Sequence, residues 1–203
     1  PPPFAGLRAR VLGQAERMLV PTEACAEVLR ELGYQRPIHH FPYPFALPEA
    51  AEPNPYLSER LGLQPPVVGY VGRLEPEKGL LDLLAAAQLL RERGRSIHLL
   101  LVGEGPQRAE LERRAAADLP GQVHFTGYVP HDQVAPYFLA LDVLALPSRT
   151  TPAWKEQFGR VLLEAWGYGV PVVGSDSGHI PLLIRETGGG LVFREGDSED
   201  LAE

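Results

Sequence analysis

The sequence lacks several features that are typical of secreted, metal-binding or membrane proteins. It contains one cysteine, Cys25, so no internal disulfide can form, which excludes a disulfide-stabilised secreted scaffold and indicates a reducing compartment. No Cys and His residues stand at zinc spacing, so no structural metal is implied. The chain also has no run of about 18 apolar residues and no basic segment followed by an apolar one. We therefore predict neither a membrane span nor a secretion signal.

Basic residues are scarce and scattered. The 19 Lys and Arg residues are outnumbered by 26 Asp and Glu residues, which gives a formal net charge of -7. Because nucleic-acid binding needs clustered cations to neutralise phosphates, we expect no nucleic-acid partner. With 44% hydrophobic residues among 203, the composition is typical of a globular protein, and we expect it to be cytoplasmic.

Proline, in contrast, is crowded into the stretch PIHHFPYPFALPEAAEPNP. Helices and central strands do not tolerate so many prolines, so residues 37–64 are predicted to be an interdomain linker, with one or two helical turns at YLSERLGL. Before it, residues 1–36 carry helical patterns at RARVLGQAERML and TEACAEVLRELG, with a short strand at MLV between them. Thr22 is a candidate N-cap for the second helix, and Gly33 would end it.

From Val67 onward, short apolar runs alternate with helical stretches. The predicted strands are VVGYV, IHLLLV, VHFTGYV, DVLALP, PVVGS and GLVF. The predicted helices are GLLDLLAAAQLLRERG, PQRAELERRAAADL, HDQVAPYFLAL, FGRVLLEAWGYG and HIPLLIRET. This alternation predicts an α/β fold over residues 65–203, with a Rossmann-like, doubly wound parallel sheet of about six strands. Asp197 has the position of a helix N-cap close to the last residue, so we expect this domain to be truncated and the chain to be a piece of a longer polypeptide.

In such sheets, ligands bind beyond the carboxyl ends of the strands. The first strand is followed by GRLEPEKG, where Gly72 permits a close backbone approach and Arg73 and Lys78 place cations around the start of a helix. Arginine and lysine both bind phosphate oxygens, so this segment predicts a diphosphate site. The alternative is that the two cations pair with Glu75 and Glu77.

Two further turns lie on the same expected rim. After the second strand, Gly103 and Gly105 resemble part of a dinucleotide fingerprint, but Arg108 replaces its third glycine, so a tight strand-to-helix turn is favoured over nicotinamide binding. After the third strand, Gly127 and Tyr128 lie where backbone groups or an aromatic face could meet a base. For Tyr128, simple packing is the alternative.

The stretch KEQFGRVLLE follows the fourth strand and holds two carboxylates. If a helix begins near Phe158, Glu156 lies in the loop before it, and the unpaired amides of Phe158, Gly159 and Arg160 point toward what Glu156 faces. Glu164 lies about two turns further on, and helical side chains lean back toward the N-terminus, so its carboxylate also aims at the helix start. The alternative is a surface pair between Arg160 and Glu164.

In order, GRLEPEKG, VGEGP, VHFTGYVP, DVLALPS, EQFGRVLLEA, GVPVVGSDSG and GGLVFREGD resemble the donor-binding half of the retaining glycosyltransferases of family 4, which have the GT-B fold. The resemblance covers about residues 65–203. The segment MLVPTEACAEVLRELG resembles the end of the family's acceptor-binding domain, so residues 1–36 are interpreted as its remnant. The resemblance implies transfer of a sugar from a nucleotide-diphosphate sugar to an acceptor, with no cofactor and no required metal.

The resemblance also implies roles for individual residues. Arg73 and Lys78 match cations that stabilise the departing diphosphate, and with Glu156 they are the candidate catalytic residues. Glu156 is expected to hold hydroxyls of the donor sugar, and Glu164 those of the ribose. The other candidate donor-binding positions are Gly72 and Gly103, the amides of Phe158 and Gly159 for phosphate, and Gly127 with Tyr128 for the base.

Departures from the family pattern limit these expectations. Most of the acceptor-binding domain is absent, so this piece should bind donor without turning it over, and the acceptor, whether glycan, lipid or small molecule, stays open. The missing domain could contact a membrane. His179, in SDSGHIP, is interpreted as an exposed loop histidine rather than a substrate contact. Alternative functions are a non-catalytic nucleotide-sugar binding module, or a GT-B epimerase or hydrolase.

Overall fold

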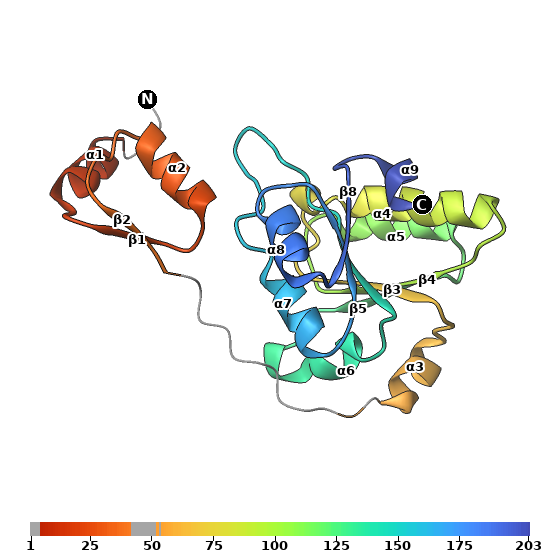
Figure 1. Cartoon of the computed structure of the whole chain (residues 1–203). Coiled ribbons are helices and arrows are strands. Elements are labelled where there is room, and N and C mark those ends of the chain that lie inside the picture. The colour runs from red at the N-terminus through yellow and green to blue at the C-terminus, as the bar shows by residue number, and fades with distance from the viewer. Residues whose placement is uncertain (1–4, 42–51, 53) are drawn as a thin grey trace. The chain divides into compact units, whose positions relative to one another are not determined.

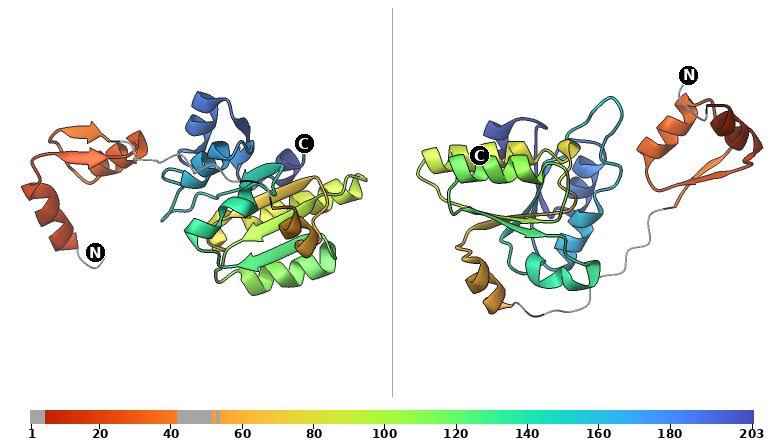
Figure 2. Two further views of the ribbon diagram at one scale, coloured as in Figure 1. Left: turned by 90° about the horizontal axis from the view of Figure 1, so that it is seen from below. Right: turned by 180° about the vertical axis from the view of Figure 1, so that it is seen from behind.

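A computed structural model describes residues 5–41, 52 and 54–203. The chain forms two compact units, Pro1–Phe45 and Ala46–Glu203, which are drawn in Figures 1 and 2. The division falls inside the stretch 37–64 that was predicted to be a linker, and residues 42–51 and 53 of that stretch lie outside the described residues.

The first unit contains two helices and two short strands. These are α1 (Ala5–Gln14), β1 (Met18–Val20), α2 (Glu23–Glu31) and β2 (Ile38–His40). The strands pair in parallel, and Thr22 caps α2 as expected by accepting a hydrogen bond from the Cys25 amide. Strand β2 was not anticipated, because it lies in the proline-rich stretch. Pro37 is tolerated there since its carbonyl accepts from the Met18 amide at 3.1 Å, and its missing N–H falls before the strand.

The second unit is built on the predicted six-stranded parallel sheet. Its strands are β3 (Val67–Val71), β4 (His98–Val102), β5 (Val123–Gly127), β6 (Val143–Leu146), β7 (Val172–Ser175) and β8 (Gly190–Phe193). Their spatial order is β5-β4-β3-β6-β7-β8, and every neighbouring pair is parallel. This is the expected Rossmann-like, doubly wound arrangement, and all six expected strands are present.

Helices connect the strands and cover both faces of the sheet. They are α4 (Leu80–Glu92), α5 (Arg108–Asp118), α6 (Ala135–Phe138), α7 (Arg160–Gly167) and α8 (Ile180–Thr187), with 3-10 turns at Pro76–Lys78 and His131–Gln133. Figures 1 and 2 show α4 and α5 side by side on one face, with α7 and α8 on the other. The sheet is therefore buried from both sides, and Leu99, Leu100 and Leu101 of β4 expose 0% of their surface.

One helix is much shorter than the sequence pattern predicted, and another forms as expected. Residues 131–141 were predicted to be one helix, but they form a 3-10 turn followed by the four-residue α6, because Pro136 has no amide hydrogen with which to continue a helix from the preceding turn. Before the sheet, α3 (Pro55–Leu61) forms the expected helical turns at YLSERLGL, and it begins at Asn54, whose side chain accepts from the Tyr56 amide.

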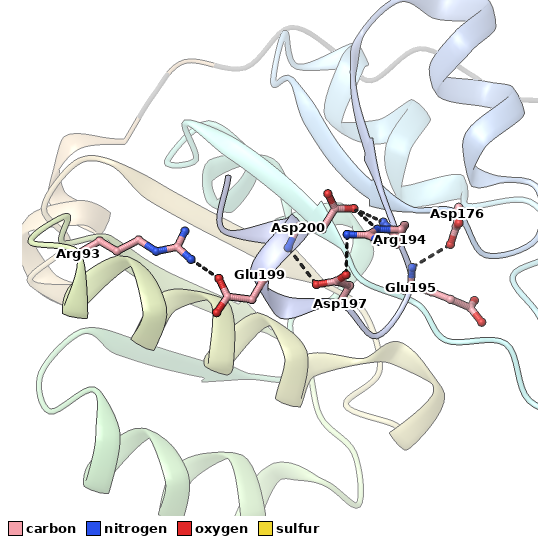
Figure 3. A network of polar contacts seen from close by, with 7 residues as sticks. All are labelled: Arg93, Asp176, Arg194, Glu195, Asp197, Glu199 and Asp200. Atoms are coloured by element: carbon pink, nitrogen blue, oxygen red, sulfur yellow. Dashed lines mark hydrogen bonds and ion pairs between the residues drawn. The ribbon is translucent and has the colours of Figure 1, made fainter.

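The last helix, α9 (Ser198–Leu201), packs against α4, and a network of charged groups lies around it. Figure 3 shows Arg93, the C-cap residue of α4, paired with Glu199, and Arg194 held by the carboxylates of Asp197 and Asp200. Asp197 caps α9 as predicted, because its side chain accepts from the Asp200 amide at 3.1 Å. The end of β8 is thereby fastened to the face of the sheet that α4 covers.

The order of the strands reverses direction between β3 and β6, which creates a topological switch point in the sheet. The chain runs from β3 outward to β4 and β5, and then returns to β6 on the other side of β3. The loops after β3 and β6 therefore diverge at this switch point, and ligands of open α/β sheets bind in the crevice that such loops leave.

Candidate functional site

A cavity of about 260 Å³ lies at the carboxyl ends of β3, β4 and β5. Its wall is formed by residues that directly follow these strands and by one side chain from α7. The lining residues are Val71, Gly72, Arg73, Val102, Gly103, Glu104, Tyr128, Val129, His131, Val134 and Glu164. Five predicted donor-binding residues, Gly72, Arg73, Gly103, Tyr128 and Glu164, are thus brought together here.

The floor of the cavity is made of backbone in close contact. Gly72 and Gly103 have φ angles of +153° and +140°, which other residues rarely adopt. A Cβ added at Gly103 would lie 1.9 Å from the Gly72 carbonyl oxygen, so this position has room only for glycine. The Gly103 amide donates to the Gly127 carbonyl at 3.0 Å. Gly127 therefore supports the floor from beneath, although its atoms do not line the cavity.

A buried tyrosine supports the loop after β3 from below. The Tyr70 side chain is 1% exposed, and its hydroxyl donates to the Arg73 carbonyl at 2.7 Å. Burial, and then the negative charge of Glu156, raise the pKa of this phenol, so it stays a neutral donor. The bond fixes the backbone of the residue whose guanidinium borders the cavity.

Glu164 reaches the cavity from α7, as the lean of helical side chains predicted. Its side chain is 16% exposed, and burial raises the pKa of its carboxyl, although His131 and Arg160 act in the opposite direction. The alternative surface pair also exists, but it is loose, with 3.6 Å between an Arg160 nitrogen and Glu164 Oε1. Because a carboxylate held this far from water lacks strong partners, hydroxyl groups of a ligand would satisfy it.

Lys78 and Glu156 form a buried ion pair across the switch point. Lys78 Nζ lies 2.8 Å from Glu156 Oε2, and the two side chains expose only 14% and 13% of their surface. The predicted alternative, in which both cations pair with their sequence neighbours, holds for Arg73, which contacts Glu75 at 3.3 Å. It is wrong for Lys78, because the topology offers a better-buried partner than Glu77.

Two further donors converge on the Glu156 carboxylate. The buried hydroxyl of Ser148 donates to Oε2 at 3.2 Å, and the Gly159 amide donates to Oε1 at 3.3 Å. A cation, a hydroxyl and a backbone amide therefore surround one anionic group, which is the same set of donors that binds phosphate oxygens.

The start of α7 corrects one prediction. The helix begins at Arg160, with Gly159 as its N-cap at φ +70°, rather than near Phe158. Glu156 lies in the loop before it, as expected, but the Gly159 amide, which was expected to be unpaired, is bound by this carboxylate. A left-handed glycine closes the turn so tightly that the amide points back toward Glu156.

His179 is not the exposed loop histidine that was expected. It is half-buried at the N-cap of α8, where its ring stacks on Phe158 with 6.0 Å between ring centroids. Its amide donates to the Glu156 carbonyl at 3.0 Å, and burial lowers the pKa of its imidazole. His179 therefore holds the backbone of the loop that carries Glu156.

The predicted residues thus form two neighbouring groups, the cavity group and the Lys78–Glu156 group with Gly159. Sequence reasoning missed several members. Ser148 and Trp154 belong to the ion pair, and Glu104 and His131 line the cavity. The signal for Ser148 is its place directly after a predicted strand, where hydroxyl groups as well as charged side chains contact ligands.

Within residues 5–41, 52 and 54–203, no three His, Cys, Asp or Glu side chains are grouped so that they could hold a metal ion. No helix among these residues is both long and apolar enough to cross a membrane.

Comparison with known proteins adds the family. Residues 65–203 match the model of a family described as Glycosyl transferases group 1. The chain is 35% identical over 163 residues to a 2-deoxystreptamine glucosyltransferase of Streptomyces kanamyceticus, with 76% of this chain and 41% of that protein aligned. It is 39% identical over 145 residues to a GDP-mannose-dependent alpha-(1-6)-phosphatidylinositol monomannoside mannosyltransferase of Mycobacterium tuberculosis, with 70% of this chain and 37% of that protein aligned.

The fold is shared with solved structures. The crystal structure of Anabaena Alr3699/HepE in complex with UDP and glucose superposes with a TM-score of 0.79 at 25% identity, and covers 98% of this chain and 56% of that one. The chain spans less than half of the length of the two curated relatives and little more than half of this solved chain.

Proposed function

The chain belongs to the glycosyl transferases of group 1, and from this premise we propose that it is the donor-binding half of a retaining glycosyltransferase of family 4. In the proposed reaction, the bond between the anomeric carbon and the nucleoside diphosphate breaks. A bond to an acceptor hydroxyl oxygen forms on the same face of the sugar, and the departing diphosphate takes up the hydroxyl proton. The observation that carries the proposal is the Lys78–Glu156 pair at the switch point, next to a cavity that contains Glu164.

We assign the nucleoside to the cavity. Its volume of about 260 Å³ is slightly below the roughly 300–1,000 Å³ typical of small-molecule sites, so only part of a nucleotide sugar would be enclosed. The half-buried carboxylate of Glu164 can accept hydrogen bonds from the ribose hydroxyls. The exposed ring of Tyr128 and the backbone beside Gly127 suit the base, and HepE, which shares this fold, binds UDP.

The diphosphate is assigned to the space between the two groups. Arg73 borders the cavity, and Lys78 lies five residues later in the same loop, paired with Glu156, so the two cations would contact the two phosphates. Cations placed where negative charge develops lower the barrier for its departure. We propose that they do this without a required metal, and that activity persists in the presence of a chelator. Glu156 would then be free to hold hydroxyls of the transferred sugar.

Calorimetric titration with UDP, GDP, ADP and their sugars tests the proposal. One of these nucleotides should bind to the wild-type chain, and Arg73→Ala and Glu164→Ala should each weaken it. Arg95→Ala is the matched control, because Arg95 is exposed just before β4, at the amino-terminal end of the strands, whereas the cavity lies at their carboxyl ends. Absence of binding by every nucleotide diphosphate would refute the proposal.

Transfer itself is proposed for the longer protein. Because this chain spans less than half of its curated relatives, we propose that it binds donor but needs the remaining chain for turnover. NMR analysis of the products from the longer protein, with a hydroxyl-bearing acceptor present, would show a new glycosidic bond of retained configuration. Release of free sugar, or an epimerised donor, would contradict transfer.

A further inference from the structure

The ammonium group of Lys78 has an aromatic ring on one side. Lys78 Nζ lies 4.5 Å from the centroid of the Trp154 ring, which is within the range of about 6 Å for a cation–π interaction. Glu156 Oε2 lies 2.8 Å away, so a carboxylate and an indole ring hold the same cation. Neither the sequence motifs nor the proposed donor contacts account for this tryptophan.

Trp154 is held by a closed turn rather than by a loose loop. The Thr151 amide donates to the Trp154 carbonyl at 2.7 Å, and the Trp154 amide donates back at 3.2 Å. Pro152 occupies the second position of this four-residue turn, where its fixed φ angle is favourable. The Ala153 amide also donates to Thr151 Oγ1 at 3.3 Å. These bonds set the direction in which the indole leaves the backbone.

The base of this turn is anchored on two elements. The guanidinium of Arg149 makes two bonds to the carboxylate of Asp82, which is 6% exposed on α4. Thr150 Oγ1 lies 2.9 Å from the hydroxyl of Ser177, which follows β7. The segment between β6 and Trp154 is therefore fixed both to α4 and to the loop after β7, and these contacts place the turn that carries the ring.

We propose that Trp154 is a positioning residue that keeps the Lys78 ammonium where the donor diphosphate binds. This inference rests on the proposed function. A lysine side chain is a flexible stem that carries a strongly hydrated point charge. If a diphosphate takes over part of its contact with Glu156, the indole keeps the ammonium from turning out into water. Trp154 thus acts on the phosphates only through Lys78.

The first test compares ligands with and without phosphates. Affinity for UDP, GDP and ADP, and for the matching nucleosides, would be measured on wild type, Trp154→Leu and Trp154→Phe. Trp154→Leu should weaken binding of the diphosphate about tenfold, equivalent to about 1.4 kcal/mol, and leave the nucleoside unchanged. Trp154→Phe keeps a ring face and should restore most of the affinity. Equal weakening of nucleoside and diphosphate, or no weakening, would overturn the inference.

A second test asks whether the effect passes through Lys78. Trp154→Leu should weaken diphosphate binding in the wild-type background but not in Lys78→Met, where there is no cation to hold. A persistent effect in Lys78→Met would overturn the inference while leaving the proposed function intact. Wild-type protein that binds no nucleotide at all would overturn both.

Fluorescence provides a readout in which Trp154 itself is kept. Trp166, whose Nε1 donates to the Gly189 carbonyl, can be replaced by phenylalanine, so that Trp154 is the remaining tryptophan. Diphosphate should then change the Trp154 emission, because the cation over the ring is drawn toward phosphate. The nucleoside should not change it, and Lys78→Met should abolish the response. An identical response in Lys78→Met would refute the role proposed for Trp154.

Discussion

Replacing Lys78 by methionine should markedly destabilise the larger unit. The substitution leaves Glu156, which is 13% exposed, without the cation that lies 2.8 Å away. Losing one partner of a buried pair costs about 3–5 kcal/mol when nothing else compensates the remaining charge. Here Ser148 and the Gly159 amide still donate to the carboxylate, so we expect a loss of roughly 2–3 kcal/mol in the free energy of unfolding. For a unit of this size, that corresponds to a fall in Tm of roughly 4–12 °C.

A double-mutant cycle with Glu156→Gln isolates the pair. Because the double variant buries no charge, it should recover about 1–2 kcal/mol relative to the sum of the single changes. Urea unfolding would be followed by tryptophan fluorescence, which reports the larger unit alone, since Trp154 and Trp166 both belong to it. Lys155→Met is the matched control. Wild-type stability in Lys78→Met, or strictly additive single changes, would refute the argument from burial.

Three further predictions concern backbone strain, pH and capping. Gly79→Ala should lower the free energy of unfolding by more than about 3 kcal/mol, because φ at this position is +66° and the new Cβ would lie 1.8 Å from a backbone carbonyl oxygen. Gly94 has a similar φ of +74° but lies in open space, so Gly94→Ala should cost only about 1 kcal/mol. Urea midpoints of the two variants that fall together would contradict this difference. Because the pKa of Glu164 is raised in the folded state, ionisation of its carboxyl opposes folding. Wild type should therefore be less stable than Glu164→Gln at a pH above the folded-state pKa. This difference in the free energy of unfolding should disappear at a pH below the unfolded-state pKa. Unfolding measured across pH 4–8 checks the sign, and a deficit that grows as the pH falls would reverse it. Asp197→Ala removes the bond that caps α9 at Asp200 and should cost about 1 kcal/mol, with faster hydrogen exchange confined to the residues around α9. Unchanged exchange there would show that the cap contributes nothing.

The fold was largely predictable because its signals are local. Apolar runs such as Leu99–Leu101 are buried on both faces of the sheet, and the helical pattern of α4 reflects one apolar side. Two predictions were wrong because of proline. The helix predicted over 131–141 is interrupted at Pro136, and strand β2 forms beside Pro37 because the pairing there needs only the Pro37 carbonyl.

The site was predictable only in part because its main interaction is not local. Lys78 and Glu156 are 78 residues apart, and spacing alone favours Glu77 as the lysine's partner. Only the reversal of strand order between β3 and β6 brings the two loops together. Trp154 gave no periodic signal, since it lies in a turn whose direction depends on bonds that Thr151 makes to it.

If the cavity binds the nucleoside as proposed, the contact between Gly72 and Gly103 limits how its base preference can be changed. A side chain at Gly103 would press on the Gly72 carbonyl and separate the ends of β3 and β4, and a Cβ at Gly72 would lie 2.8 Å from the Tyr70 hydroxyl, which holds the Arg73 carbonyl. Tyr128 and His131, by contrast, are exposed on the rim, where a substitution leaves this glycine contact in place. Libraries that aim to alter base preference should vary these two positions and leave the glycines constant.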